Sequence, residues 1–120
     1  MGIKRFEDVI AWQKAKDLTL TIYKIFKDNI DFSFRDQIQR ASVSVMNNIA
    51  EGYERKGNKE YARFLYIAKG SAGEVRSMLY LAKDLGYVES ESFNRLYSLA
   101  EDIAKMLAGL IKKVESGLHP

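Results

Sequence analysis

The sequence contains no cysteine, one proline and one histidine among its 120 residues. Without cysteine it can form no disulfide scaffold, thiol nucleophile, iron–sulfur cluster or cysteine-based zinc site. The histidine, His119, is the next-to-last residue, where chains commonly fray. Histidine-based metal sites and general-base catalysis therefore have almost nothing to be built from. We expect no metal site and no cofactor.

Long apolar runs are also missing. No stretch approaches the roughly 18 uninterrupted apolar residues of a membrane span, and the first residues lack the features of a signal peptide. The chain carries 19 basic and 16 acidic residues, a net charge of +3. This mildly basic balance is compatible with nucleic-acid contact without requiring it. We expect a soluble, cytoplasmic protein that does not bind membranes.

Hydrophobic residues make up 47% of the sequence. They recur at steps of three and four along nearly the whole chain, which is typical of amphipathic helices. The pattern predicts helices over residues 7–27, 34–56, 59–85 and 91–116, with Ser33 as the cap of the second. Four helices of similar length with short joints favour an all-α, up-down-up-down four-helix bundle. Residues 1–120 are expected to form it as one domain.

The apolar positions exceed what the core of one bundle needs. The first predicted helix carries a second apolar set on another side, and the third adds apolar residues to its main stripe. We interpret the surplus as a face that packs against another copy of the chain. The alternative is an irregular bundle that takes these residues into its own core. The residues of this predicted oligomer face are Val9, Trp12, Leu20, Tyr23, Leu65, Met78 and Leu81.

Polar and small residues interrupt the apolar stripes of the second and third helices. Glycine inside a helix costs roughly 1 kcal/mol relative to alanine, so it usually marks a close backbone approach. One interpretation is a structural polar seam between the two helices; the other is a binding site in which Arg40, Asn48 and Glu51 face a ligand. The residues concerned are Arg40, Ser44, Asn48, Glu51, Gly52, Gly70, Ser71 and Glu74.

Several runs around this seam resemble one known family. Residues 36–45 (DQIQRASVSV) and 47–52 (NNIAEG) resemble the signature helix of the four helix bundle family, also called the 23S ribosomal RNA intervening-sequence or S23 ribosomal proteins. Residues 6–8 (FED), 12–15 (WQKA), 64–71 (FLYIAKGS) and 85–87 (LGY) agree in order and spacing. The resemblance extends over about residues 6–111. Met46 replaces the family's usual proline, and Gln39 replaces a common second arginine.

The resemblance implies a cytoplasmic, bacterial four-helix bundle that assembles as a homopentamer. A related group resembles the accessory proteins of diversity-generating retroelements, which are basic pentamers that work with a reverse transcriptase and RNA. The family's biochemical activity is poorly defined. Met46 lacks the ring by which the family's proline would kink the second helix, and Gln39 weakens a paired-arginine phosphate clamp.

Basic residues cluster around the joint between the second and third helices, with tyrosines between them. Lysine and arginine neutralise phosphates, and tyrosine stacks on bases, so this combination suits RNA or single strands. The alternative interpretation is an ordinary solvated surface. The candidate phosphate contacts are Arg40, Arg55, Lys56, Lys59 and Arg63.

The leading hypothesis is a non-catalytic homo-oligomer that binds RNA or another nucleic acid without sequence preference. The alternative is a protein-interaction adaptor that uses the surplus apolar face and has no nucleic-acid role. An enzyme is disfavoured because the chain has no Glu-x-x-His pair for a di-iron site. Its serines also have no histidine base within reach, and no strand precedes a glycine-rich phosphate loop. We expect no small-molecule substrate.

Overall fold

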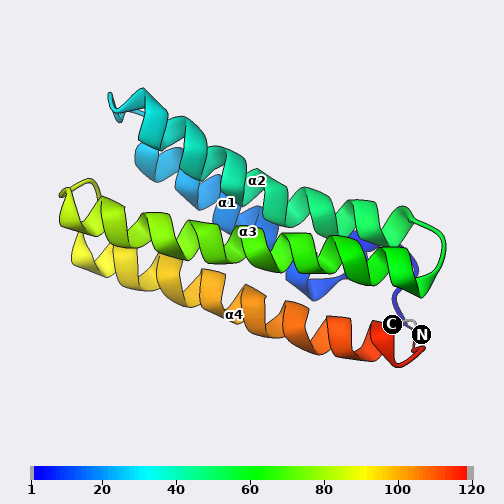
Figure 1. Cartoon of the computed structure of the whole chain (residues 1–120). Helices are drawn as coiled ribbons and strands as arrows, with labels where there is room; N and C mark the ends of the chain where they lie inside the picture. Colours follow the sequence, from blue (N-terminus) through cyan, green and yellow to red (C-terminus); the bar gives the residue numbers. More distant parts are fainter. Residues whose placement is uncertain (1, 119–120) are drawn as a thin grey trace.

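Four α-helices make up most of the chain. The computed structural model describes residues 2–118, so His119 and both ends of the predicted 1–120 domain lie outside the described residues. The helices are α1 (Ile10–Phe26), α2 (Phe32–Glu54), α3 (Asn58–Asp84) and α4 (Ser90–Glu115), preceded by the short 3-10 helix η1 (Phe6–Asp8) (Figure 1). Residues 2–118 contain no strand. The prediction of an all-α fold with four helices is confirmed.

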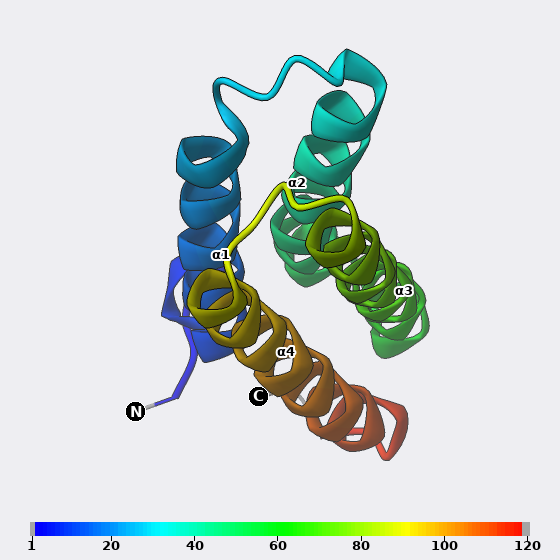
Figure 2. The same cartoon turned by 90° about the vertical axis from the view of Figure 1, so that its left-hand side faces the viewer.

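The helices pack as an elongated antiparallel bundle of 45 × 22 × 21 Å (Figure 1). Helix α2 packs against α1 and α3, and α4 packs against α3 and α1, whereas within the described residues no Cα atom of α1 comes within 8 Å of one in α3. The end-on view in Figure 2 shows α1 and α3 at diagonal corners. Consequently the outward surfaces of α1 and α3 lie on opposite sides of the bundle.

Helix α1 begins three residues later than predicted because the chain leaves helical geometry at Val9. Residues Phe6–Asp8 form η1, and the Val9 backbone is extended, with φ −72° and ψ 117°. The Val9 N–H donates to the Phe6 carbonyl at 2.9 Å. The Phe6 ring meets Trp12 edge-on with centroids 5.2 Å apart, so this N-terminal segment lies against α1.

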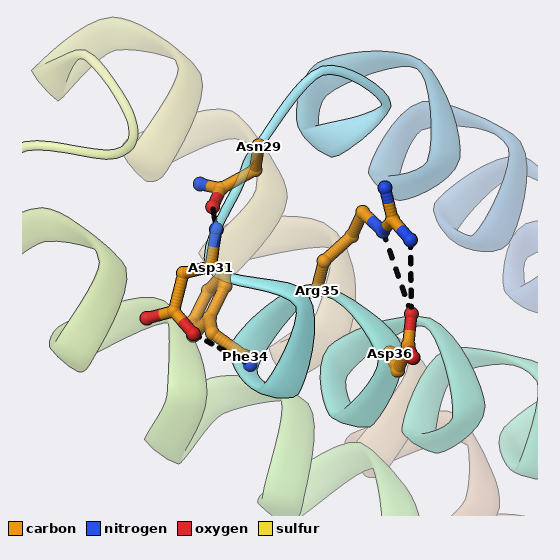
Figure 3. Close-up of polar contacts among 5 residues, drawn as sticks. All are labelled: Asn29, Asp31, Phe34, Arg35 and Asp36. Atoms are coloured by element: carbon orange, nitrogen blue, oxygen red, sulfur yellow. Dashed lines mark hydrogen bonds and ion pairs between the residues drawn. The ribbon is translucent and has the colours of Figure 1, made fainter.

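The joint between α1 and α2 is organised by Asp31 (Figure 3). One carboxylate oxygen accepts a hydrogen bond from the Phe34 N–H at 3.2 Å, and the other accepts one from the Tyr87 hydroxyl at 2.8 Å. The Asp31 N–H donates to the Asn29 side chain at 2.8 Å. Asp31 is therefore the N-cap of α2, and the prediction that Ser33 caps it is wrong because Ser33 already lies in the first turn.

A glycine with positive φ follows the C-terminal end of both α3 and α4. Gly86 and Gly117 have φ values of +76° and +91°, which L side chains rarely adopt. After α3, the Tyr87 N–H donates to the Ala82 carbonyl at 2.8 Å, and the Gly86 N–H donates to the Lys83 carbonyl at 3.1 Å. Residues 113–118 repeat this pair of hydrogen bonds after α4. Both ends are Schellman motifs, which satisfy the last carbonyls of each helix.

The core takes in three residues predicted for the oligomer face. Val9, Leu65 and Met78 are 2%, 0% and 8% exposed, so that part of the prediction is wrong. Helix α3 packs against both α2 and α4, and its buried arc is therefore wide enough to include positions on either side of the main stripe. Val9 is buried because the chain entering α1 folds back onto the bundle.

Helix α2 runs without interruption from Phe32 to Glu54 and passes through Met46. The family that the sequence resembles usually has proline at the position of Met46. Met46 itself packs half-buried against the core.

Within the described part of the chain, none of the helices has the length and apolar character needed to cross a membrane.

Candidate nucleic-acid interface

Four of the predicted phosphate contacts gather at the end of the bundle where α2 joins α3. Arg55 and Lys56 follow the last residue of α2, and Lys59 and Arg63 lie in the first two turns of α3. Gly57, with φ +83°, turns the chain between them. All four basic side chains are exposed. We call Arg55, Lys56, Lys59 and Arg63 the basic end.

The two arginines of the basic end lie over the ring of Phe64. Their guanidinium carbons are 4.9 Å (Arg55) and 4.5 Å (Arg63) from the ring centroid. Arg55 also pairs with Glu51 at 3.0 Å, and Arg63 pairs with Glu60 through two hydrogen bonds of 3.0 and 3.3 Å. The ring and carboxylates hold both guanidinium groups in place, and each carboxylate offsets part of the positive charge.

The protonation states follow from these pairs. The hydrogen bond from Arg63 lowers the pKa of Glu60, and the same bond raises the pKa of Arg63. Both groups are therefore charged near neutral pH. Lys56 and Lys59 make no ion pair or hydrogen bond within residues 2–118, although the charge of Lys59 also helps to lower the pKa of Glu60. These two ammonium groups are therefore less compensated than the two arginines.

Only one of the interleaved tyrosines is exposed for stacking. Tyr61 is 1% exposed, and burial raises its pKa to about 12. Tyr53 is half-buried and donates to the Ile3 carbonyl at 3.3 Å. Tyr66 is 51% exposed on α3. The Tyr53 and Tyr61 rings also meet edge-on with centroids 5.9 Å apart, so both belong to the packing, and Tyr66 is the accessible ring of the three.

Arg40 lies apart from the basic end. It is exposed on α2, 15 residues before Arg55, which corresponds to about 22 Å along a helix. It borders a separate shallow hollow of about 320 Å³ with Ser33, Asp36 and Gln37. A phosphate contact by Arg40 remains a prediction, but the structure does not bring this residue together with the other four.

A groove between α3 and α4 starts at the basic end. It consists of two adjoining hollows of about 650 and 460 Å³, which share Tyr66 and Glu115. The Tyr66 hydroxyl crosses from α3 to donate to both carboxylate oxygens of Glu115 at 3.2 and 3.3 Å. This hydrogen bond raises the pKa of Tyr66. The charged residues lining the groove are Lys59, Glu60, Arg63, Lys69, Lys112 and Glu115.

Sequence reasoning missed Lys69, Lys112 and Glu115 as parts of this site. Lys69 and Lys112 are 43 positions apart, and they meet one groove only because α3 and α4 run antiparallel side by side. The α3 side of the groove could have been predicted from the sequence, because its residues recur at steps of three and four and therefore share one face of the helix. These residues are Lys59, Arg63, Tyr66 and Lys69.

The polar seam exists in a smaller form than predicted. The Ser44 and Ser71 hydroxyls lie 2.8 Å apart and join α2 to α3. The Asn48 side-chain amide donates to the Ser44 carbonyl at 2.8 Å and to the Ser44 hydroxyl at 3.0 Å. Gly52 is buried, and a Cβ built on it would lie 2.8 Å from the Phe64 Cβ. Of the eight predicted seam residues, Ser44, Asn48, Gly52 and Ser71 therefore lie at the contact between α2 and α3.

The other four predicted seam residues are exposed, so their assignment to the seam is wrong. A row of residues at four-residue steps turns by about 40° per step, since an α-helix has 3.6 residues per turn. The row therefore leaves the α2–α3 contact within two or three steps. Nothing lies within 4 Å of a Cβ built on Gly70. The exposed residues are Arg40, Glu51, Gly70 and Glu74.

The remaining members of the predicted oligomer face occupy two sides of the bundle. Leu20 and Tyr23 are 49% and 43% exposed on α1, and Leu81 is 47% exposed on α3. Trp12 is half-buried under the Lys16 ammonium group, which lies 5.8 Å from the indole ring. Because α1 and α3 are diagonal, the exposed residues form two separate apolar patches instead of one face.

The residues described by the structure contain no cluster of three or more histidine, aspartate or glutamate side chains suited to a metal ion. The hollows of about 650 and 460 Å³ form one groove along α3 and α4, and the charged and aromatic part of its lining consists of lysine, arginine, glutamate and tyrosine.

Comparison with known proteins agrees with the fold and identifies the family. The chain is similar to the crystal structure of a protein with unknown function from the S23 ribosomal protein family of Bacteroides thetaiotaomicron, with a TM-score of 0.80 and 22% identity over 86% of this chain and 96% of that chain. A search of curated proteins finds no match. Residues 7–109 match the family model described as 23S rRNA-intervening sequence protein, and the chain therefore belongs to that family.

Proposed function

We propose that the chain is a non-catalytic, self-associating helical bundle that binds RNA or another nucleic acid through its basic end. The observation that carries this proposal is the concentration of Arg55, Lys56, Lys59 and Arg63 at the α2–α3 joint, where neither lysine has an ion-pair partner within residues 2–118. Such groups neutralise backbone phosphates without reading sequence. The family resemblance supports the same proposal and a cytoplasmic, bacterial setting.

The arginines of the basic end suit this role although each has a carboxylate partner. Their ion pairs are exposed, and exposed pairs contribute little to stability, so a phosphate can compete with the carboxylate. Both guanidinium groups contact the Phe64 ring, and this contact reduces the conformational freedom that the arginines would otherwise lose on binding.

Fluorescence anisotropy with a labelled structured RNA, at about 50 and 200 mM salt, tests the proposal. The double substitution Lys56→Ala/Lys59→Ala is expected to weaken binding and to reduce the salt dependence. The matched control is Lys24→Ala/Lys27→Ala, which removes the same charge at the opposite end of the bundle. If the control weakens binding equally, net charge alone is responsible; if the wild-type chain binds no nucleic acid at the lower salt, the proposal fails.

Self-association is supported by the two exposed apolar patches. Leu20 and Tyr23 on α1 and Leu81 on α3 face opposite sides, so a contact between the patches of two copies joins different surfaces. Contacts of that kind form a ring when the rotation between copies closes and an open filament when it does not, whereas a two-fold dimer uses the same patch twice. A ring is consistent with the homopentamer that the family resemblance implies.

Light scattering on patch variants tests the ring. Leu20→Glu and Leu81→Glu are each expected to give monomers, because either substitution removes one half of every contact. A mixture of the two variants should form heterodimers and nothing larger, since each pair retains one intact combination of patches. A wild-type chain that is monomeric at micromolar concentration would refute self-association, and two-fold dimers unaffected by mixing would refute the ring.

A protein-interaction adaptor is the second candidate function. It is favoured by Ile30 and Phe32, which are 86% and 59% exposed at the end of the bundle opposite the basic end. Apolar side chains that are exposed next to one another mark contact sites for other proteins, and Ile30 and Phe32 are only two positions apart. A partner recovered from cell extract after nuclease treatment, and lost with Ile30→Ser/Phe32→Ser, would favour the adaptor over nucleic-acid binding.

A further inference from the structure

The groove between α3 and α4 combines a half-exposed aromatic ring with lysines on both sides of it. We propose that this groove is a single-strand site, in which an unpaired base stacks on Tyr66 while Lys59, Lys69 and Lys112 contact the adjoining phosphates. The inference rests on the proposed function, because it names the form of nucleic acid that the bundle prefers. It adds a specific ring and two lysines that do not belong to the basic end.

Tyr66 is suited to stacking because its ring is both accessible and held. The side chain is 51% exposed, and its hydroxyl is anchored across the groove on Glu115 at 3.2 and 3.3 Å. Anchoring reduces the rotational freedom that a stacked base would otherwise remove. Tyr80 is equally exposed at 51%, but its ring already packs on Phe93 and Tyr97, with centroids 5.5 and 5.3 Å away.

The charges around Tyr66 favour an anionic ligand. Four basic and two acidic side chains line the groove, so its net charge is positive. Glu60 is engaged by Arg63, and Glu115 accepts the Tyr66 hydroxyl. Lys59, Lys69 and Lys112 have no ion-pair partner within residues 2–118, so their ammonium groups are available for phosphates. Lys59 and Lys69 are about 15 Å apart along α3, with Tyr66 between them.

A single strand fits this arrangement better than a duplex. A duplex keeps its bases inside the stack and offers lysine side chains only its phosphates. A single strand presents the faces of its bases, which stack on aromatic side chains beside a positively charged groove. The basic end alone would bind both forms, so a preference for single strands is what distinguishes the groove.

The test is fluorescence anisotropy with a labelled oligouridine of about 12 nucleotides and a labelled RNA duplex. Tyr66→Ala is expected to weaken single-strand binding about tenfold, which corresponds to about 1.4 kcal/mol, and to leave duplex binding unchanged. Tyr66→Phe retains the ring and should bind nearly as the wild type does. Tyr80→Ala is the matched control for removal of an equally exposed tyrosine from the same helix, and circular dichroism verifies that each variant is folded.

The salt dependence separates the ring from the lysines. Tyr66→Ala should leave the slope of log affinity against log salt unchanged, because stacking releases no counterions. Lys69→Ala/Lys112→Ala should reduce the slope by about 1.4, or about 0.7 for each lost phosphate contact.

Three results would overturn the inference. If single strand and duplex bind equally and Tyr66→Ala changes neither, the groove assignment fails while the proposed function stands. If Tyr66→Ala and Tyr80→Ala weaken single-strand binding equally, stacking at Tyr66 is refuted. If neither nucleic acid binds the wild-type chain, the groove assignment and the proposed function fail together.

Discussion

The close approach of α2 and α3 at Gly52 provides a sharp test of the packing. A Cβ built on Gly52 would lie 2.8 Å from the Phe64 Cβ, 3.1 Å from Tyr61 Cδ1 and 3.2 Å from the Tyr61 carbonyl oxygen. The Phe64 Cβ and the Tyr61 carbonyl are fixed to the α3 backbone, so neither can rotate away. Gly52→Ala therefore forces the two helices apart or distorts the first turns of α3.

The expected magnitude follows from two opposing effects. Overpacking a well-packed contact costs about 1–3 kcal/mol, and a clash with backbone-fixed atoms belongs at the upper end of that range. Replacing a helical glycine by alanine returns about 1 kcal/mol of helix propensity. We expect Gly52→Ala to lower the free energy of unfolding by about 2 kcal/mol. For a domain of this size that corresponds to a melting temperature about 8 °C lower.

Gly70 and Gly109 are matched controls for the same substitution. Both are exposed positions inside helices, and nothing lies within 4 Å of a Cβ built on either. Gly70→Ala and Gly109→Ala therefore receive the helix-propensity gain without a clash. Each is expected to raise the free energy of unfolding by about 1 kcal/mol.

Urea unfolding followed by circular dichroism measures all three variants. The measurement is repeated at two protein concentrations, because self-association makes apparent stability depend on concentration. A Gly52→Ala variant as stable as the wild type would refute the close approach of α2 and α3. A destabilised Gly70→Ala variant would instead show that this residue lies in a contact of its own, as the sequence pattern predicted.

Three further substitutions probe the seam, the α2 cap and the buried tyrosine. Asn48→Ala removes the hydrogen bonds to Ser44 and should cost about 1–2 kcal/mol in urea unfolding, and an unchanged midpoint would contradict the structural role. Asp31→Ala removes both the α2 cap and the acceptor for Tyr87, so we expect a loss of about 2 kcal/mol by the same assay, where Ser33→Ala should change little. Burial raises the pKa of Tyr61 to about 12, so the fold favours the neutral hydroxyl. The stability that the neutral Tyr61 contributes is therefore complete below pH 10 and is lost as the pH rises towards 12. Between pH 9 and 12 the wild type should therefore lose up to about 2 kcal/mol of unfolding free energy relative to Tyr61→Phe. A difference between the two proteins that does not change with pH would contradict this prediction.

Helix ends were predictable where the determining residues are local. Helices α3 and α4 end two residues before Gly86 and Gly117, because a Schellman motif needs only a glycine and the turn before it. The start of α2 was less accessible to sequence reasoning. Ser33 and Asp31 are both good capping residues, and the choice of Asp31 coincides with a hydrogen bond from Tyr87, which is 56 positions away.

Which side chains face outward could not be predicted as well as the helices. Leu65 and Leu81 both lie beside the main apolar stripe of α3, yet one is 0% and the other 47% exposed. The difference depends on how wide an arc α2 and α4 cover, and this is set by the arrangement of the bundle. The seam prediction failed at Arg40 for a related reason, because a row at four-residue steps winds away from the contact.

The diagonal arrangement of α1 and α3 allows the proposed surfaces to act together. Leu81 lies 15 residues beyond Tyr66 on α3, about 22 Å along the helix, so the contact that would join copies is well separated from the groove. The α1 patch is diagonal to α3 and leaves the groove open as well. A ring built through these patches would repeat the groove in every copy, and a single strand that spans several grooves would bind more tightly than one groove allows. The affinity for oligonucleotides of increasing length tests this arrangement. If a ring of single-strand sites forms, the affinity of the wild type should rise steeply with oligonucleotide length. The affinity of the monomeric Leu81→Glu variant should rise only weakly.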